Sequence, residues 1–106
     1  MDNTIAATIL EQLGGRRFVI MTGIREFHTN NGDDLCMKIG RNKSKANHLC
    51  IEYDYDEDLY TMRFFRITKS QKITEVRTFE GVYCDQLEEL FREVTGLETR
   101  MSRIHE

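Results

Sequence analysis

The sequence predicts an α+β domain in which an antiparallel meander of about five strands lies between two helices, in the order α-β-β-β-β-β-α. Two patterns support this prediction. Along the middle of the chain, apolar residues alternate with polar ones, which is the period of a strand with one buried face. Near both ends, apolar residues recur every three or four positions, as in an amphipathic helix. Short polar turns separate the expected strands, so neighbouring strands should pair antiparallel and leave one face for the helices.

The two helices are expected at residues 3–13 and 83–95. Gly14-Gly15 ends the first and Gly96 ends the second, because glycine readily adopts the left-handed conformation that closes a helix. Residues 98–106 are polar and are expected to form a frayed tail. The apolar positions that define the helices are Ile5, Ala6, Ile9, Leu10 and Leu13, and then Tyr83, Leu87, Leu90, Phe91 and Val94.

Five strands are expected between these helices. Residues 16–21 are apolar on both faces, which suits a central strand or one covered by a helix. Residues 22–32 are expected to form a loop, with Asn31-Gly32 as a turn pair. The apolar alternation switches at Phe64-Phe65, which indicates a bulge or burial on both faces. The remaining strands are expected at 35–39, 49–53 and 59–67, with a more polar edge strand at 72–79.

The bulk properties indicate one domain, spanning residues 1–106. Hydrophobic residues make up 40% of the chain and charged residues 31%, which is typical of soluble globular proteins. No apolar run approaches the length of a membrane-spanning helix, and the N-terminus lacks a secretory signal pattern, so we expect a cytoplasmic protein. The net charge of −3 argues against strong nonspecific DNA binding by the whole surface, but not against a local basic patch.

The three cysteines, Cys36, Cys50 and Cys84, are an odd number at wide spacing. Metal sites usually contain close cysteine pairs, so we expect three free thiols in a reducing compartment. Cys84 begins the last helix, a position that suits a reactive thiol, but a cysteine nucleophile also needs a positioned base. The sequence places no base beside it, and a packed thiol is expected. Cys36, if exposed on its strand, could serve as a contact in a homodimer.

Asp54, Asp56 and Asp58 have the spacing that begins a calcium-binding loop. Such a loop needs glycine at its sixth position and a bidentate glutamate at its twelfth. Those positions hold Leu59 and Phe65 here. The sequence therefore predicts a solvated turn and no metal site.

Other catalytic patterns also fail. Gly14-Gly15-Arg16-Arg17 follows a helix and precedes an expected strand, which reverses the strand–loop–helix order of phosphate-binding loops. No pair of carboxylates stands out for acid–base chemistry among the many surface acids. We therefore expect a protein without a cofactor that is not an enzyme.

The charge pattern of the central hairpin is the strongest functional signal. A basic loop at residues 40–48 leads into the strand at 49–53, and an acidic turn at 54–58 follows it. Opposite charges at the two ends of one strand can form a recognition surface without any chemistry. The residues expected to bind a partner are Arg41, Lys43, Lys45, Asp54, Asp56, Glu57 and Asp58.

Single-stranded nucleic acid is the alternative ligand. Basic groups attract the phosphates, and aromatic side chains interleaved with them stack on the bases. The same charges could also be ordinary solvated surface, since basic residues on edge strands protect sheets from aggregation. The residues for this alternative are Arg41, Lys43, Lys45, Arg63 and Arg66, with Tyr60 or Phe64 as stacking groups.

Five segments carry a resemblance that covers nearly the whole chain: residues 8–15, 18–23, 38–49, 81–87 and 93–97. In them the chain resembles a family of short, uncharacterised accessory proteins of bacteriophages and mobile elements. No membrane association is expected from the sequence itself, and the resemblance implies expression in a bacterial cytoplasm and action by stoichiometric binding. It suggests an inhibitor of a host defence nuclease, such as a CRISPR effector, whose partner is a host protein or ribonucleoprotein. It brings no catalytic residues with it.

Overall fold

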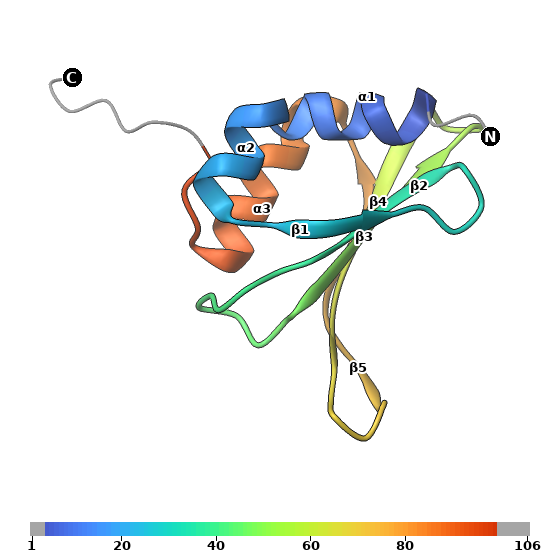
Figure 1. Ribbon diagram of the computed structural model, residues 1–106. Helices are drawn as coiled ribbons and strands as arrows, with labels where there is room; N and C mark the ends of the chain where they lie inside the picture. Colours follow the sequence, from blue (N-terminus) through green and yellow to red (C-terminus); the bar gives the residue numbers. More distant parts are fainter. Residues whose placement is uncertain (1–3, 100–106) are drawn as a thin grey trace, which may run out of the picture.

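The computed structural model of the protein describes residues 4–99 and contains one five-stranded sheet with all its described helices on one face (Figure 1). The strands follow each other in the order β1-β2-β3-β4-β5, and every neighbouring pair is antiparallel. The expected α+β meander is therefore confirmed. The elements are α1 (Thr4–Leu13), α2 (Gly15–Thr22), β1 (Arg25–His28), β2 (Asp34–Lys38), β3 (His48–Asp54), β4 (Leu59–Ile67), β5 (Ile73–Val82), a 3-10 turn η1 (Cys84–Gln86) and α3 (Leu87–Thr95).

The strand expected at residues 16–21 was wrong, because this segment forms helix α2. Gly14 and Gly15 have φ angles of 131° and 62°, and they redirect the chain from α1 straight into a second helix. In α2 only Phe18 is fully buried, while Ile20 is 68% exposed. The apolar run was interpreted as a strand buried on both faces, but its burial is that of a helix with one covered side.

The fifth strand is instead β1, which lies within the segment expected to be a loop. It pairs with β2 through Arg25↔Lys38 and His28↔Cys36, with an irregularity between these pairs. Glu26 has a φ angle of 60° at this bulge. A four-residue strand with a bulge has no regular alternation, which is why the sequence pattern missed it.

The core lies between the helices and one face of the sheet. Phe18 of α2 and Phe91 of α3 meet edge to face with ring centroids 4.9 Å apart. The bulge expected at Phe64-Phe65 is confirmed, because the β4–β5 register shifts there. The strand residues on the core side are Leu35, Met37, Leu49, Ile51, Tyr60, Met62 and Phe64, and all are buried.

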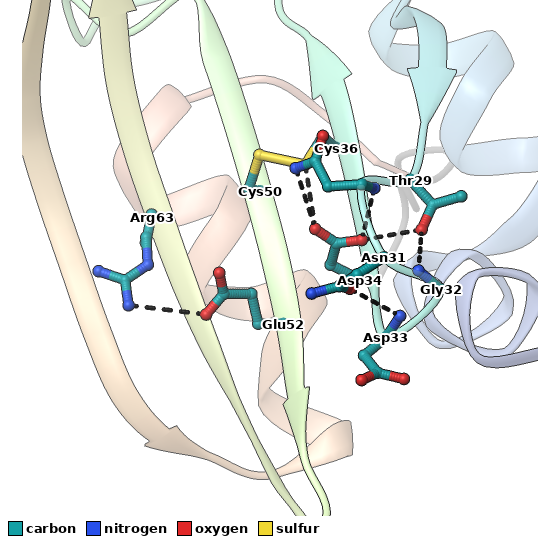
Figure 2. Close-up of a disulfide and its surroundings, with 10 residues drawn as sticks. Thr29, Asn31, Gly32, Asp33, Asp34, Cys36, Cys50, Glu52 and Arg63 are labelled. Carbon is teal, nitrogen blue, oxygen red and sulfur yellow. Dashed lines mark hydrogen bonds and ion pairs between the residues drawn. A yellow bond between two sulfur atoms is a disulfide. The ribbon is translucent and has the colours of Figure 1, made fainter.

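The expectation of three free thiols was wrong for two of them, because Cys36 and Cys50 form a disulfide on the opposite, open face of the sheet (Figure 2). They face each other across β2 and β3 with Cα atoms 4.1 Å apart, the short spacing of directly opposed residues. Cys36 is 1% exposed, so it offers no dimer contact. Cys84 is free and exposed rather than packed. The sequence did not predict this disulfide, because a separation of 14 residues does not show that Cys36 and Cys50 lie opposite each other on paired strands.

The last helix ends as expected. Gly96 adopts the left-handed conformation, and its N–H donates to the carbonyl oxygen of Arg92 at 2.8 Å. Thr99, at the start of the expected tail, is buried, and its hydroxyl donates to Glu88 Oε2 at 2.5 Å. The rest of that expected tail, residues 100–106, lies outside the described residues. Between residues 4 and 99, no helix is both long enough and apolar enough to cross a bilayer.

Candidate functional site

The structure places the basic loop and the acidic turn at opposite ends of β3 (Figure 1). The β3–β4 register, with His48 opposite Phe65, also brings the β4–β5 turn to the basic end. Neither residues 38–48 nor residues 66–74 contain an acid. We call the cations of these two segments the basic surface: Lys38, Arg41, Lys43, Lys45, Arg66, Lys69 and Lys72, all of them exposed.

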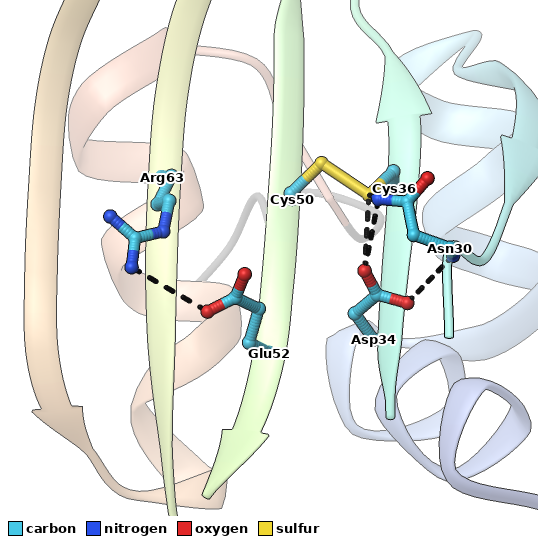
Figure 3. A network of polar contacts seen from close by, with 6 residues as sticks. All are labelled: Asn30, Asp34, Cys36, Cys50, Glu52 and Arg63. Atoms are coloured by element: carbon cyan, nitrogen blue, oxygen red, sulfur yellow. Dashed lines mark hydrogen bonds and ion pairs between the residues drawn. A yellow bond between two sulfur atoms is a disulfide. The ribbon is translucent and has the colours of Figure 1, made fainter. Parts of the chain in front are cut away.

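Within residues 4–99, none of these seven cations forms an ion pair with a carboxylate. Glu26 lines the same hollow as Lys38, so this cation has an acid close by. The ion pair that is present joins Arg63 to Glu52 at 3.6 Å on the open face (Figure 3), with both side chains about half exposed. Arg63, expected to contact nucleic acid, therefore has its charge partly compensated.

The side chain of Asn42 organises the basic loop from inside. Its Nδ2 donates to the carbonyl oxygens of Gly40 at 2.8 Å and Ala46 at 3.0 Å. Its Oδ1 accepts hydrogen bonds from the backbone N–H and the hydroxyl of Ser44, and the Ser44 hydroxyl accepts from the Ala46 N–H at 3.1 Å. The loop is thus folded by its own polar groups, which leaves its charged side chains to solvent.

Three contacts hold this loop against other elements. The backbone N–H of Lys43 donates to the carbonyl oxygen of Thr95, at the end of α3, at 3.0 Å. The Lys43 aliphatic chain passes close over Gly96, where an added Cβ would lie 3.0 Å from Lys43 Cδ. On the other side, Arg66 Nη1 donates to the Lys45 carbonyl oxygen at 3.0 Å.

Asn47 joins the loop to the end of β4. Its Oδ1 accepts the Ile67 N–H at 2.9 Å and its Nδ2 donates to the Ile67 carbonyl oxygen at 3.1 Å. This side chain continues the pairing of β3 and β4 for one more residue. A hollow of about 290 Å³ lies here, and its lining includes Arg41, Asn42, Ser44 and Arg66.

The stacking groups expected from the sequence were wrong. Tyr60 is 6% exposed and Phe64 is 0% exposed, because both belong to the core side of β4. Phe65 lies on the open face, where its ring stacks on that of His48 with centroids 5.4 Å apart and planes 14° apart. Alternation along β4 could have identified Phe65, but the parity switch at the bulge made the choice ambiguous.

The acidic turn is also ordered by its own groups. Asp54 Oδ1 accepts the Asp56 N–H at 2.9 Å, so this carboxylate binds backbone donors. The Tyr53 hydroxyl donates to Asp58 Oδ1 at 2.6 Å, and this hydrogen bond raises the pKa of Tyr53 to about 12. Among the described residues, no group of three or more His, Cys, Asp or Glu side chains could hold a metal ion.

Asp34, beside the disulfide, is a buried carboxylate with a complete set of donors (Figures 2 and 3). Its Oδ1 accepts from the Thr29 hydroxyl at 2.8 Å and the Asn30 N–H at 2.9 Å, and Asn30 Nδ2 donates to its Oδ2 at 3.1 Å. Burial alone would raise the pKa of Asp34, but these hydrogen bonds outweigh it, and the pKa is lowered. No role was expected for Asp34 from the sequence; its hydrogen bonds order the β1–β2 loop.

No protein family matches the chain, and no curated protein or solved structure does either.

Proposed function

We propose that this protein is a non-enzymatic binding protein whose basic surface contacts the phosphate backbone of a nucleic acid. The observation that supports this is that two basic segments meet at one end of the sheet. They touch where Arg66 donates to the carbonyl oxygen of Lys45, a residue 21 positions earlier in the sequence. Seven exposed cations, none of which forms an ion pair with a described acid, match a polyanion better than they match an apolar or cationic ligand. The opposite charge at the far end of β3 orients the protein on its ligand.

The order of the loop supports the same proposal. Because Asn42, Asn47 and Arg66 already fix the backbone, little conformational entropy is lost when the loop meets a rigid array of phosphates. The hollow is lined by Arg41 and Arg66, whose guanidinium groups suit phosphate oxygens.

A second candidate function is inhibition of a host defence nuclease, such as a CRISPR effector, through charged contacts. The acidic turn favours it, because Asp54, Asp56, Glu57 and Asp58 are exposed on a turn that its own hydrogen bonds hold in shape. Ordered carboxylates can occupy the phosphate-binding groove of such an enzyme by charge complementarity. The partner would be a host protein or ribonucleoprotein.

Binding assays separate the two candidates. For nucleic-acid binding, the affinity for a labelled oligonucleotide should fall steeply as salt rises, and Lys43→Ala/Lys45→Ala should weaken binding and reduce the salt slope by about 1 per lost phosphate contact. Arg16→Ala, which removes an exposed arginine from α2, is the matched control and should have no effect. Absence of binding at low salt would contradict this proposal.

For the inhibitor, capture of a defence nuclease from bacterial lysate should survive Lys43→Ala/Lys45→Ala but fail when the four acids of the turn are replaced by amides. Capture that is unchanged when the four acids are replaced by amides would contradict the inhibitor proposal.

The bacterial cytoplasm, as the site of action, is part of both proposals. In that compartment the Cys36–Cys50 disulfide has to withstand reduction by cellular thiols. Thiol trapping in fresh lysate measures whether the two cysteines are oxidised.

A further inference from the structure

We infer, resting on the proposed nucleic-acid function, that the ligand is single-stranded and that one of its bases stacks against the His48–Phe65 ring pair on the open face of the sheet. We call these two residues the ring pair.

The ring pair is suited to stacking by its position. His48 and Phe65 are directly opposed on β3 and β4, and their near-parallel rings form a stack that a third flat ring can extend. Both are partly exposed, and neither belongs to the buried core. All described helices cover the other face of the sheet (Figure 1), so a ligand can approach from this side.

The state of His48 favours the same use. Burial lowers the pKa of His48, and the nearby charge of Lys38 lowers it further although Glu26 opposes this, so the neutral imidazole is favoured. Its Nδ1 lies 2.8 Å from Asn47 Oδ1, which holds the ring in one orientation. A fixed, uncharged aromatic ring stacks on a base with little loss of side-chain entropy.

The basic surface borders the ring pair at Lys38 and Arg66, while Glu75 on β5 is opposite Phe65. Lys38 is opposite His48 on β2, and Arg66 follows Phe65 on β4, where it holds the Lys45 carbonyl. A strand whose base stacks here would therefore place its neighbouring phosphates among these cations. A duplex presents its base faces only to one another, so it could use the cations but not the rings.

The experiment compares three polyanions at one salt concentration: a mixed-sequence single strand, the same sequence as a duplex, and inorganic polyphosphate, which has no bases. The wild-type protein should bind the single strand more tightly than the duplex. Phe65→Leu should weaken single-strand binding about tenfold, as expected for loss of one stacked base, while polyphosphate binding and the salt slope stay unchanged.

Two further variants keep this test decisive. Tyr55→Leu removes another exposed aromatic ring at the opposite end of β3 and should not change binding. Phe65→Trp should retain affinity and report stacking through quenching of its fluorescence by the single strand but not by polyphosphate. Equal binding of duplex and single strand, with a folded Phe65→Leu variant that binds like the wild type, would overturn the inference and leave the basic surface intact. Failure to bind any of the three polyanions would instead overturn the proposed function.

Discussion

The guanidinium of Arg66 donates to the backbone carbonyl of Lys45 at 3.0 Å, and this hydrogen bond joins two hairpins that carry the same charge. Two hydrogen bonds between the Asn47 side chain and the Ile67 backbone also join these hairpins. Arg66 thus holds the backbone of the basic loop in place while its own charge remains exposed.

We expect Arg66→Ala to weaken oligonucleotide binding by about tenfold, because it removes a phosphate contact and frees the loop backbone at Lys45. Arg66→Lys keeps the charge but loses the planar donor, so it should recover only part of the affinity. Anisotropy titrations measure both variants. Full recovery by lysine would show that the hydrogen bond is irrelevant to binding.

Gly96→Ala and Gly23→Ala form a matched pair. Both glycines end helices with φ angles above 70°, so alanine at either should destabilise the fold by about 1 kcal/mol. Only at Gly96 would the new Cβ meet the Lys43 chain, whereas nothing lies within 4 Å of a Cβ at Gly23. Chemical unfolding should show a loss for both variants, and oligonucleotide affinity should fall for Gly96→Ala alone. Equal affinities would mean that the Lys43 position does not matter.

Asp34 should make stability sensitive to acid. Its pKa is lower in the folded protein than its ordinary value of 3.8, so its carboxylate stabilises the fold above that pH, and the contribution is lost as pH falls through the folded pKa. Asp34→Ala removes three hydrogen bonds to a buried group and should destabilise the protein by about 2–3 kcal/mol at pH 7. Unfolding curves at pH 7 and pH 3 should differ less for this variant than for the wild type. If the stability difference between pH 7 and pH 3 is the same in the variant as in the wild type, groups other than Asp34 cause the acid sensitivity.

The disulfide should stabilise the hairpin that carries the basic loop. Closing a loop of this length restricts the unfolded chain and contributes about 3 kcal/mol in the chain-entropy model. Dithiothreitol should therefore lower the stability of the wild type and of Cys84→Ser, but not of Cys36→Ala/Cys50→Ala. Thermal melts with and without reductant measure this. If the reductant still destabilises the double alanine variant, its effect does not come from the Cys36–Cys50 disulfide.

The sequence predicted the fold class and both charged segments because these depend on local periodicity and composition. It misassigned α2 because residues 16–21 are apolar enough for either structure, and only the turn at Gly14-Gly15 starts the helix in which Phe18 is fully buried and Val19 partly buried. The site was predictable where charges are adjacent in sequence, as in the loop with Lys43. It was not predictable where register matters, as for Phe65 and the Cys36–Cys50 pair, since pairing between strands leaves no trace in spacing.

The salt dependence of oligonucleotide binding decides whether the basic surface binds phosphates. The proposal predicts a linear fall of the logarithm of affinity with the logarithm of salt concentration, with a slope that Lys43→Ala/Lys45→Ala makes shallower and Arg16→Ala leaves unchanged. Binding without salt dependence, or a slope that the double variant does not alter, would contradict it.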